Sequence, residues 1–268
     1  EAPHWSPRLA MVAIAGVTIG ALVAGAAVWR MTRPATSADV VRFQVSAPPK
    51  TELFTAQLST FAISPDGRIL AFTTGAIGSE RQLWIRSLGS TTARLVPGVE
   101  RPSGLTWSPD SQSIVYTAVA GGAIGPLKRL DLRSGSVITL TDVGVAGAWS
   151  ANGDVLFRGA DGRLYQIAAG GGTARPVTEL DKTLGEVAHH AAFFLPDGRR
   201  FVFHTQSSDP SKSAVYLSSL DATDRVKLLN GLTVVHAESG FLLYRRENAV
   251  MAQPFDEDSG RLTGDAKP

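Results

Sequence analysis

A short turn sequence that recurs at an almost constant spacing limits the folds open to this chain. Its clearest copy is Ser64-Pro65-Asp66-Gly67, and it ends on a residue that favours a tight turn. Four related copies end at Ser111, Gly153, Gly198 and Gly240, so successive copies lie 42 to 45 residues apart. Self-similarity with a period of this size is the signature of a repeat architecture. The sequence therefore predicts five copies of one module.

Each module has the same internal order of short apolar runs. One run precedes the turn and three follow it; in the second module they cover residues 105–107, 114–116, 127–132 and 137–140. Proline presets φ, aspartate can bond its own backbone and glycine tolerates positive φ, so the turn should join two strands of a hairpin. Four short strands per module are typical of a β-propeller blade. We expect an all-β propeller of about five four-stranded blades within residues 51–268.

The fifth module shows only three of these runs. Its last recognisable strand covers residues 250–252, and the sequence then continues through Phe255-Asp256-Glu257-Asp258. A propeller has to bring its last blade against its first, because an open one leaves an apolar face and sheet edges uncovered. Either a β-like piece at residues 40–45 completes the last blade, or further blades follow Pro268. We expect the second, a truncated propeller.

An apolar segment precedes the modules. Residues 9–28 carry no charge, and Thr18 is the only polar side chain among them. About 20 such residues are needed for a helix to cross a bilayer, whereas the apolar part of a secretory signal peptide has about 7–15. A signal peptide cleaved near Ala24-Gly25-Ala26 is the alternative. We expect a juxtamembrane segment at 1–8, a transmembrane helix at 9–29 and a proline-containing linker at 30–50.

Small residues recur four apart inside this segment. Gly16, Gly20 and Ala24 would share one side of a helix, where two helices can approach closely. They are candidates for helix packing in a homodimer, although glycine and alanine are also simply common in such helices. Arginines lie on both sides of the segment, so the positive-inside tendency does not settle its orientation.

The charge of the chain argues against a nucleic-acid-binding function. The formal net charge is +2, the isoelectric point is about 9.1 and 19% of the residues are charged. A nucleic-acid-binding protein concentrates Lys and Arg on one face, and no such concentration is present. The chain has no cysteine, so it carries no information on redox compartment.

Two likenesses to known families rest on specific stretches. An aromatic residue followed by Ser-Pro-Asp and a short apolar strand, as in Trp107-Ser108-Pro109-Asp110 and residues 114–116, resembles the TolB-type propeller repeat. Behind one membrane span, a second set of motifs is similar to the C-terminal half of bacterial membrane-anchored serine/threonine protein kinases. Those motifs are Gln82-Leu83-Trp84-Ile85-Arg86-Ser87-Leu88, Leu95-Val96-Pro97-Gly98, Gly185-Glu186-Val187-Ala188-His189, Phe194-Leu195-Pro196-Asp197-Gly198 and Pro254-Phe255-Asp256. This likeness implies a cytoplasmic kinase domain before the span and a propeller outside the cell membrane.

No catalytic motif accompanies the repeats. The chain has no glycine-rich phosphate loop with a strand lysine, no His-Arg-Asp and no Asp-Phe-Gly, and it lacks the Gly-x-Ser-x-Gly of serine hydrolases. Glu186, His189 and His190 lie close together, with His204 and His236 in later strands. Their spacing matches no helical zinc motif, so we expect polar residues between blades and no metal or cofactor site. We assign Asp66, Gly67, Asp110, Asn152, Gly153, Asp197 and Gly198 to structural turns.

These observations favour a binding protein over an enzyme. We expect a membrane-anchored, single-pass bacterial protein whose extracytoplasmic propeller is the sensor or protein-binding module of a receptor-like serine/threonine kinase. Its partners would be the membrane and another protein or an envelope ligand. A TolB-like envelope scaffold is one alternative. The propeller of a membrane-spanning winged-helix regulator, or of a hydrolase whose catalytic domain lies beyond Pro268, is another.

Overall fold

The structure, a computed structural model, describes residues 44–54, 60–75, 80–119, 123–231, 234–237, 240–246 and 249–268. It divides into two units, Glu1–Val45 and Ser46–Pro268, and the strands given below all lie in the second. Across these defined ranges, no helix is long and apolar enough to cross a membrane. The predicted helix at 9–29, with Gly16, Gly20 and Ala24, lies outside them.

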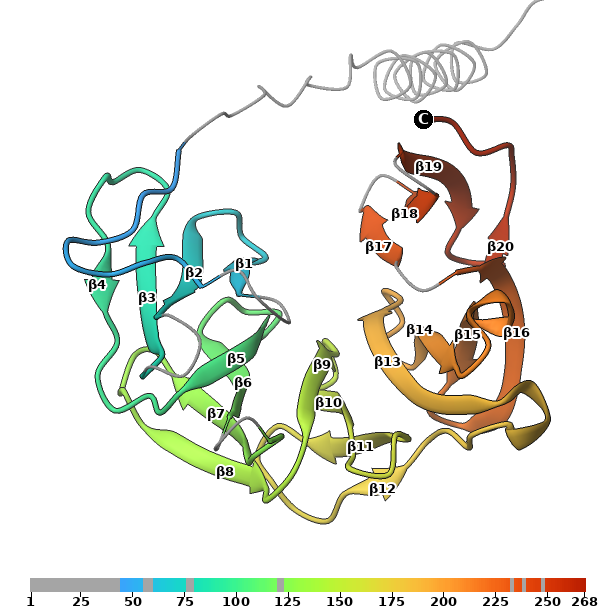
Figure 1. The fold of residues 1–268 in the computed structure, drawn as a ribbon, viewed down its shortest axis with the longest axis horizontal. Coiled ribbons are helices and arrows are strands. Elements are labelled where there is room, and N and C mark those ends of the chain that lie inside the picture. The colour runs from blue at the N-terminus through green and yellow to red at the C-terminus, as the bar shows by residue number, and fades with distance from the viewer. Residues whose placement is uncertain are drawn as a thin grey trace, which may run out of the picture. The chain divides into compact units, whose positions relative to one another are not determined.

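The second unit consists of five antiparallel sheets of four strands each, which follow one another along the chain (Figure 1). Blade 1 contains β1 (Phe61–Ile63), β2 (Ile69–Thr74), β3 (Gln82–Ser87) and β4 (Arg94–Leu95). Blade 2 contains β5 (Pro102–Trp107), β6 (Ser113–Ala118), β7 (Leu127–Asp131) and β8 (Val137–Thr141). Blade 3 contains β9 (Val145–Trp149), β10 (Asp154–Arg158), β11 (Leu164–Ala168) and β12 (Arg175–Pro176).

The last two blades carry the longest strands. Blade 4 contains β13 (Glu186–Phe194), β14 (Arg200–Ser207), β15 (Ala214–Ser219) and β16 (Ala222–Asn230). Blade 5 contains β17 (Val234–Ala237), β18 (Phe241–Arg246), β19 (Ala249–Asp256) and β20 (Arg261–Leu262). The strand order within every sheet is sequential, and the first strand of each blade contacts the first strand of the next. This arrangement confirms the predicted all-β propeller of five four-stranded blades.

One expectation about blade 5 was wrong. The sequence showed no fourth strand, yet β20 pairs with β19 through Phe255↔Leu262 and Asp256↔Arg261. A two-residue outer strand buries little apolar surface, so it produces no apolar run that a sequence pattern could reveal.

In blades 1 and 2 the repeated turn connects the first two strands through its serine. In blade 1 the Ser64 hydroxyl accepts from the amide of Ile69 at 2.9 Å, and Gly67 at φ 69° donates its amide to the Ser64 carbonyl at 2.8 Å. In blade 2 Ser108 accepts from Ser113 at 2.8 Å in the same way, and Ser111 takes the left-handed position with φ 60°. The assigned turn residues all lie between the first two strands of blades 1 to 4, and the blade 4 turn has leucine in place of the serine: Asp66, Gly67, Asp110, Asn152, Gly153, Asp197 and Gly198.

The hydrophobic core lies between blades. Among the residues that the structure defines, four apolar clusters are present, each joining the facing surfaces of two successive sheets. Between blades 3 and 4, Leu156 and Leu164 pack against Phe201 and Phe203, and all four side chains are almost completely buried. Polar links reinforce this stacking, since Trp107 of blade 2 donates its indole N–H to the carbonyl of Ala62 in blade 1 at 3.0 Å.

The connection from blade 3 to blade 4 departs from the repeat. Residues 177–185 lie between β12 and β13 and include the short 3-10 helix η1 (Lys182–Leu184). Asp181 caps this helix, because its carboxylate accepts from the amides of Thr183 and Leu184, and Gly185 ends it at φ 68°. The connection therefore places the polar side chains of residues 177–185 next to blade 4. A second 3-10 helix, η2 (Pro210–Lys212), joins β14 to β15.

Candidate functional site

The histidines and Glu186 do not form one cluster. Glu186, His189 and His190 lie on β13, His204 lies on β14 and His236 lies on β17. Glu186 meets His189, with 3.0 Å between Oε2 and Nε2, whereas the rings of His190 and His204 stack with centroids 4.8 Å apart. In the part of the chain that the structure defines, no group of three His, Asp or Glu side chains is placed to hold a metal ion.

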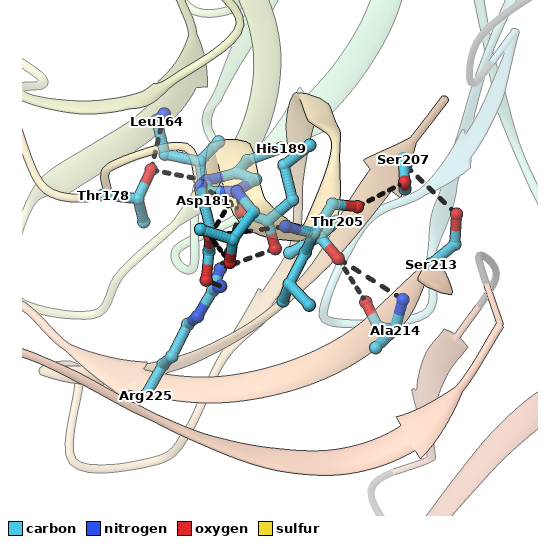
Figure 2. A network of polar contacts seen from close by, with 12 residues as sticks. Leu164, Thr178, Asp181, His189, Thr205, Ser207, Ser213, Ala214 and Arg225 are labelled. Atoms are coloured by element: carbon cyan, nitrogen blue, oxygen red, sulfur yellow. Dashed lines mark hydrogen bonds and ion pairs between the residues drawn. The ribbon is translucent and has the colours of Figure 1, made fainter. Parts of the chain in front are cut away.

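The carboxylate of Glu186 is the centre of a buried polar network, and Figure 2 labels its partners Asp181, His189 and Arg225. The Arg225 guanidinium lies 2.9 Å from Oε1, the backbone amide of Asp181 donates to Oε2 at 2.7 Å, and His189 is the third partner. The side chains of Glu186 and His189 have no exposed surface, while that of Arg225 is 19% exposed. A buried carboxylate is tolerated only when charges and hydrogen bonds of this kind surround it.

The hydrogen bonds around His189 fix its tautomer. An ionised carboxylate can only accept, so the Nε2–H of His189 donates to Glu186. Nδ1 then accepts from the hydroxyl of Thr178 at 2.9 Å, and the Thr178 oxygen accepts from the amide of Leu164 at 2.9 Å. A continuous chain of bonds thus runs from the backbone of blade 3 to β13, the first strand of blade 4.

The environment keeps Glu186 ionised and His189 neutral. Burial raises the pKa of Glu186, but hydrogen bonds from Arg225, Asp181 and His189 outweigh burial and hold that pKa below its ordinary value. Burial lowers the pKa of His189, and the bond to Glu186 offsets only part of this effect. The pair therefore has one charge, which Arg225 balances.

Two further contacts hold Arg225 in place. Its guanidinium lies 4.3 Å from the ring centroid of Tyr216, a cation–π geometry, and 3.7 Å from the carboxylate of Asp181. Hydrogen bonds to the hydroxyl and amide of Thr183 lower the pKa of Asp181, so this carboxylate is also ionised. Arg225 lies 39 residues from Glu186 in sequence, and no local pattern pointed to it.

A second set of polar bonds anchors the start of β13, beside Glu186 (Figure 2). The Ser207 hydroxyl donates to the carbonyl of Leu184 at 2.7 Å, and the Ser207 amide donates to Ser213 Oγ at 3.1 Å. Thr205 Oγ1 bonds both backbone groups of Ala214 at 3.3–3.4 Å. These bonds link η1 to the β14–β15 hairpin.

The network forms one wall of an open pocket of about 490 Å³ between blades 3 and 4. Its lining mixes both charge signs with apolar surface: Arg175, Pro176, Val177, Thr178, Glu179, Leu180, Asp181, Phe203, Ser218, Leu220, Asp221, Ala222 and Arg225. Glu186 and His189 lie behind this wall and cannot reach a bound molecule. The pocket therefore presents charged, polar and apolar side chains to a bound molecule, and the Glu186–His189 pair is not among them.

A pocket of about 530 Å³ lies in the corresponding place between blades 1 and 2. Its outer wall is again the connection to the next blade, here residues 95–101, and Lys128 pairs with the exposed Glu100 at 3.0 Å. The connection between blades 3 and 4 differs because a buried carboxylate holds it. For this reason we regard the pocket between blades 3 and 4 as the better-defined site.

Comparison with known proteins places the chain among propellers without giving it a family. No family model matches it. The uncharacterized peptidase YuxL of Bacillus subtilis (strain 168) is 32% identical over 156 residues, which cover 56% of this chain and 22% of YuxL. The chain thus spans about a fifth of the length of this curated relative.

Solved structures share the fold. TolB from Acinetobacter baumannii matches with a TM-score of 0.59 and 16% identity, over 76% of this chain and 52% of that one. A TolB from Agrobacterium tumefaciens, described as putative, matches with a TM-score of 0.53 and 18% identity, over 66% of this chain and 67% of that one. A structure from work on two prolyl endopeptidases matches with a TM-score of 0.53 and 16% identity, over 78% of this chain and 35% of that one. The chain therefore has a TolB-like β-propeller fold, which propellers of peptidases also resemble.

Proposed function

We propose that this chain carries a non-catalytic, polypeptide-binding propeller whose binding site is the pocket between blades 3 and 4. The observation that carries the proposal is the position of Glu186 and His189. They are an acid–base pair, but both side chains are fully buried and bonded to each other behind the pocket wall. The surface presented to a ligand includes Arg225 and residues of the blade connection, which can bind a ligand through charge and hydrogen bonds.

The composition of the pocket favours a polypeptide over a small apolar ligand. It offers cations, carboxylates and the apolar side chains of Pro176, Val177 and Leu220. Arg175 and Pro176 also form β12, the outermost strand of blade 3, so one edge of that sheet borders the pocket. An extended segment of a partner can use such an edge for main-chain hydrogen bonds and neighbouring pockets for its side chains.

The parent protein in this proposal is a receptor-like serine/threonine kinase, with the propeller outside the cell membrane. The kinase-like motifs and the apolar segment at 9–29 support this assignment. Reading the gene upstream of Glu1 tests it: a glycine-rich loop, His-Arg-Asp and Asp-Phe-Gly are expected there. A winged-helix domain, or a start codon directly before Glu1, would overturn the kinase assignment. Protease treatment of intact and permeabilised cells tests the location, because an extracytoplasmic propeller is cut in intact cells.

A hydrolase propeller is the second candidate, and the match to YuxL favours it. In that case a strand–helix domain with Gly-x-Ser-x-Gly follows the propeller. The sequence downstream of Pro268 distinguishes the two candidates. The third candidate, a TolB-like envelope scaffold, would have neither a kinase domain nor a hydrolase domain.

Site-specific photocrosslinking tests the binding role itself. A photoreactive amino acid at Glu179, which lies on the exposed rim of the pocket, should crosslink a discrete partner in cells. The matched control is Ile138 on β8, which is also exposed but lies in blade 2 away from this pocket. A discrete product at Glu179 and none at Ile138 supports the proposal. Equal products at both positions, or none at either, would overturn it.

A further inference from the structure

The pocket of about 530 Å³ between blades 1 and 2 plays no part in the proposed function. Its outer wall is the blade connection, residues 95–101. The amide of Val96 donates to the carbonyl of Leu83 at 2.8 Å, which holds the start of this wall against blade 1. The amide of Val119 donates to the carbonyl of Arg101 at 3.0 Å, which holds its end against blade 2. The wall of the pocket is therefore a fixed part of the fold.

Arg81 lines this pocket as a cation without a counter-charge. Its guanidinium lies 3.9 Å from the ring centroid of Phe54, and Phe54 is only 3% exposed, so a fixed aromatic ring covers one face of the guanidinium. Among the residues that the structure describes, no carboxylate forms an ion pair with Arg81. Burial lowers the pKa of Arg81, as expected for a cation that is partly removed from water. A guanidinium that stacks by its face keeps the donors in its plane for a carboxylate.

The other charged groups of the lining match a ligand with a single negative charge. Lys128 already has a partner, because its Nζ lies 3.0 Å from the exposed carboxylate of Glu100. Arg101 and Glu80 are both exposed and add one charge of each sign. Together with Arg81, the lining has three cations and two carboxylates, so one positive charge is in excess. A carboxylate balances that excess, whereas a phosphate dianion would bring a second negative charge close to Glu80 and Glu100.

The rest of the lining favours a peptide segment as the source of the carboxylate. Val99, Ala118 and Val119 provide apolar surface. Leu95 of β4, the two-residue outer strand of blade 1, also lines the pocket and is 42% exposed. Since β4 is the last strand in its sheet, its outer edge can pair with an added strand. Side chains of an added strand alternate in direction, so an acidic side chain can enter the pocket while the backbone pairs with β4.

We propose that the pocket between blades 1 and 2 is a second peptide-binding site, which takes an aspartate or glutamate side chain of an extended partner segment. Arg81 binds the carboxylate through two N–H donors, and Phe54 holds the guanidinium in place. Leu95 and Val99 contact the apolar neighbours of the acidic residue. This site uses neither Glu186 nor the pocket between blades 3 and 4, so it does not depend on the proposed function.

Fluorescence anisotropy with the full chain tests this site, with the blocked peptide acetyl-Val-Glu-Val-Glu-Val-amide as the probe. A matched peptide has glutamine in place of both glutamates and carries the same uncharged fluorophore. We expect saturable binding of the glutamate peptide and at least tenfold weaker binding of the glutamine peptide, because a charge-assisted pair is lost. Equal affinities, or no saturable binding of the glutamate peptide, would overturn the proposal. Sodium acetate that displaces the probe as effectively as unlabelled peptide would show a site for small carboxylates, and would refute the peptide site.

Arginine variants make the test specific. Arg81→Gln should weaken binding of the glutamate peptide by about tenfold or more. Arg81→Lys keeps the charge but loses the paired donors, so it should weaken binding less. The matched control is Arg94→Gln, since Arg94 is exposed on the same outer strand and does not line the pocket. Equal weakening by Arg81→Gln and Arg94→Gln would show only a general charge effect and would refute the site.

A variant of the other pocket separates this inference from the proposed function. Ala222 lines the pocket between blades 3 and 4, and Ala222→Trp should leave the affinity for the glutamate peptide unchanged. Weakening by Ala222→Trp with no effect of Arg81→Gln would place the peptide in the pocket between blades 3 and 4. That result would overturn the present inference while supporting the proposed function.

Discussion

At the scale of single residues, the Glu186 carboxylate is stable only because its three partners come from different parts of the fold. His189 is on the same strand, Asp181 caps η1 and Arg225 is on the outer strand of blade 4. Removing the charge of Glu186 would leave Arg225 partly buried and without its nearest counter-charge. Such one-sided losses are more costly than the pair itself is worth.

Glu186→Gln keeps the shape of the side chain but removes its charge, so it should destabilise the protein strongly. We expect the free energy of unfolding to fall by about 2–4 kcal/mol, somewhat less than for a completely buried pair because Arg225 reaches solvent. Urea denaturation followed by circular dichroism measures the change.

The matched control for this variant is Glu179→Gln in the same connection. Glu179 is 73% exposed and pairs with Arg163 at 2.7 Å. Exposed ion pairs contribute little, so its free energy of unfolding should stay close to that of the wild type. Equal losses in both variants would contradict the special role given to Glu186.

The free energy of unfolding should decrease as the pH falls, and part of this decrease should come from His204. The pKa of His204 is lowered by burial from its ordinary 6.5 to about 4, so the unfolded chain binds a proton that the folded chain refuses. Its contribution is complete above pH 6.5 and is lost as the pH falls toward 4, about 3 kcal/mol in all. In His204→Phe, urea midpoints measured from pH 7.5 to 4.5 should fall less steeply. An unchanged slope would contradict the assignment.

The sequence drew attention to part of this network. Glu186, His189 and His190 were noted because they lie close together in the chain. Arg225 was missed, because it reaches Glu186 through the pairing of strands within blade 4, and this relationship leaves no periodic signal in the chain.

At the scale of elements, the turns both end strands and join blades. Asn152 in the turn of blade 3 donates its side-chain amide to the carbonyl of Asp197 in the turn of blade 4 at 3.2 Å. Gly162 makes a closer contact, since its backbone lies against β13. The turn motif was visible in the sequence because its constraints are local, whereas the bonds between turns were not.

Substitutions at two glycines distinguish the effect of backbone strain from the effect of the close contact between blades. Gly162 and Gly153 have nearly equal φ values of 86° and 88°, but only Gly162 lacks space for a Cβ, which would meet the Val187 carbonyl. Gly153→Ala should lower the free energy of unfolding by about 1–2 kcal/mol, the strain of an L-residue at positive φ. Gly162→Ala should lower it by about 3 kcal/mol or more, because steric overlap is added. Equal losses in urea denaturation would refute the close contact.

At the scale of the whole molecule, the period of the turn gave the number of blades and the apolar runs gave most of their strands. The four hydrophobic clusters between successive sheets explain why the period is so regular, since each module must present the same two faces to its neighbours. The pocket could not be predicted, because it depends on residues 177–185, where the chain leaves the repeat.

The pocket between blades 3 and 4 is the proposed binding place of a polypeptide. Ala222 is exposed and lines this pocket, so Ala222→Trp should fill it, whereas Ala168→Trp adds the same bulk at an exposed strand position outside it. The decisive measurement is the dissociation constant of the partner crosslinked at Glu179 for the wild type and both variants. We predict affinity about tenfold weaker, near 1.4 kcal/mol, for Ala222→Trp and unchanged affinity for Ala168→Trp. Unchanged affinity in Ala222→Trp, or equal losses in the two variants, would contradict the account.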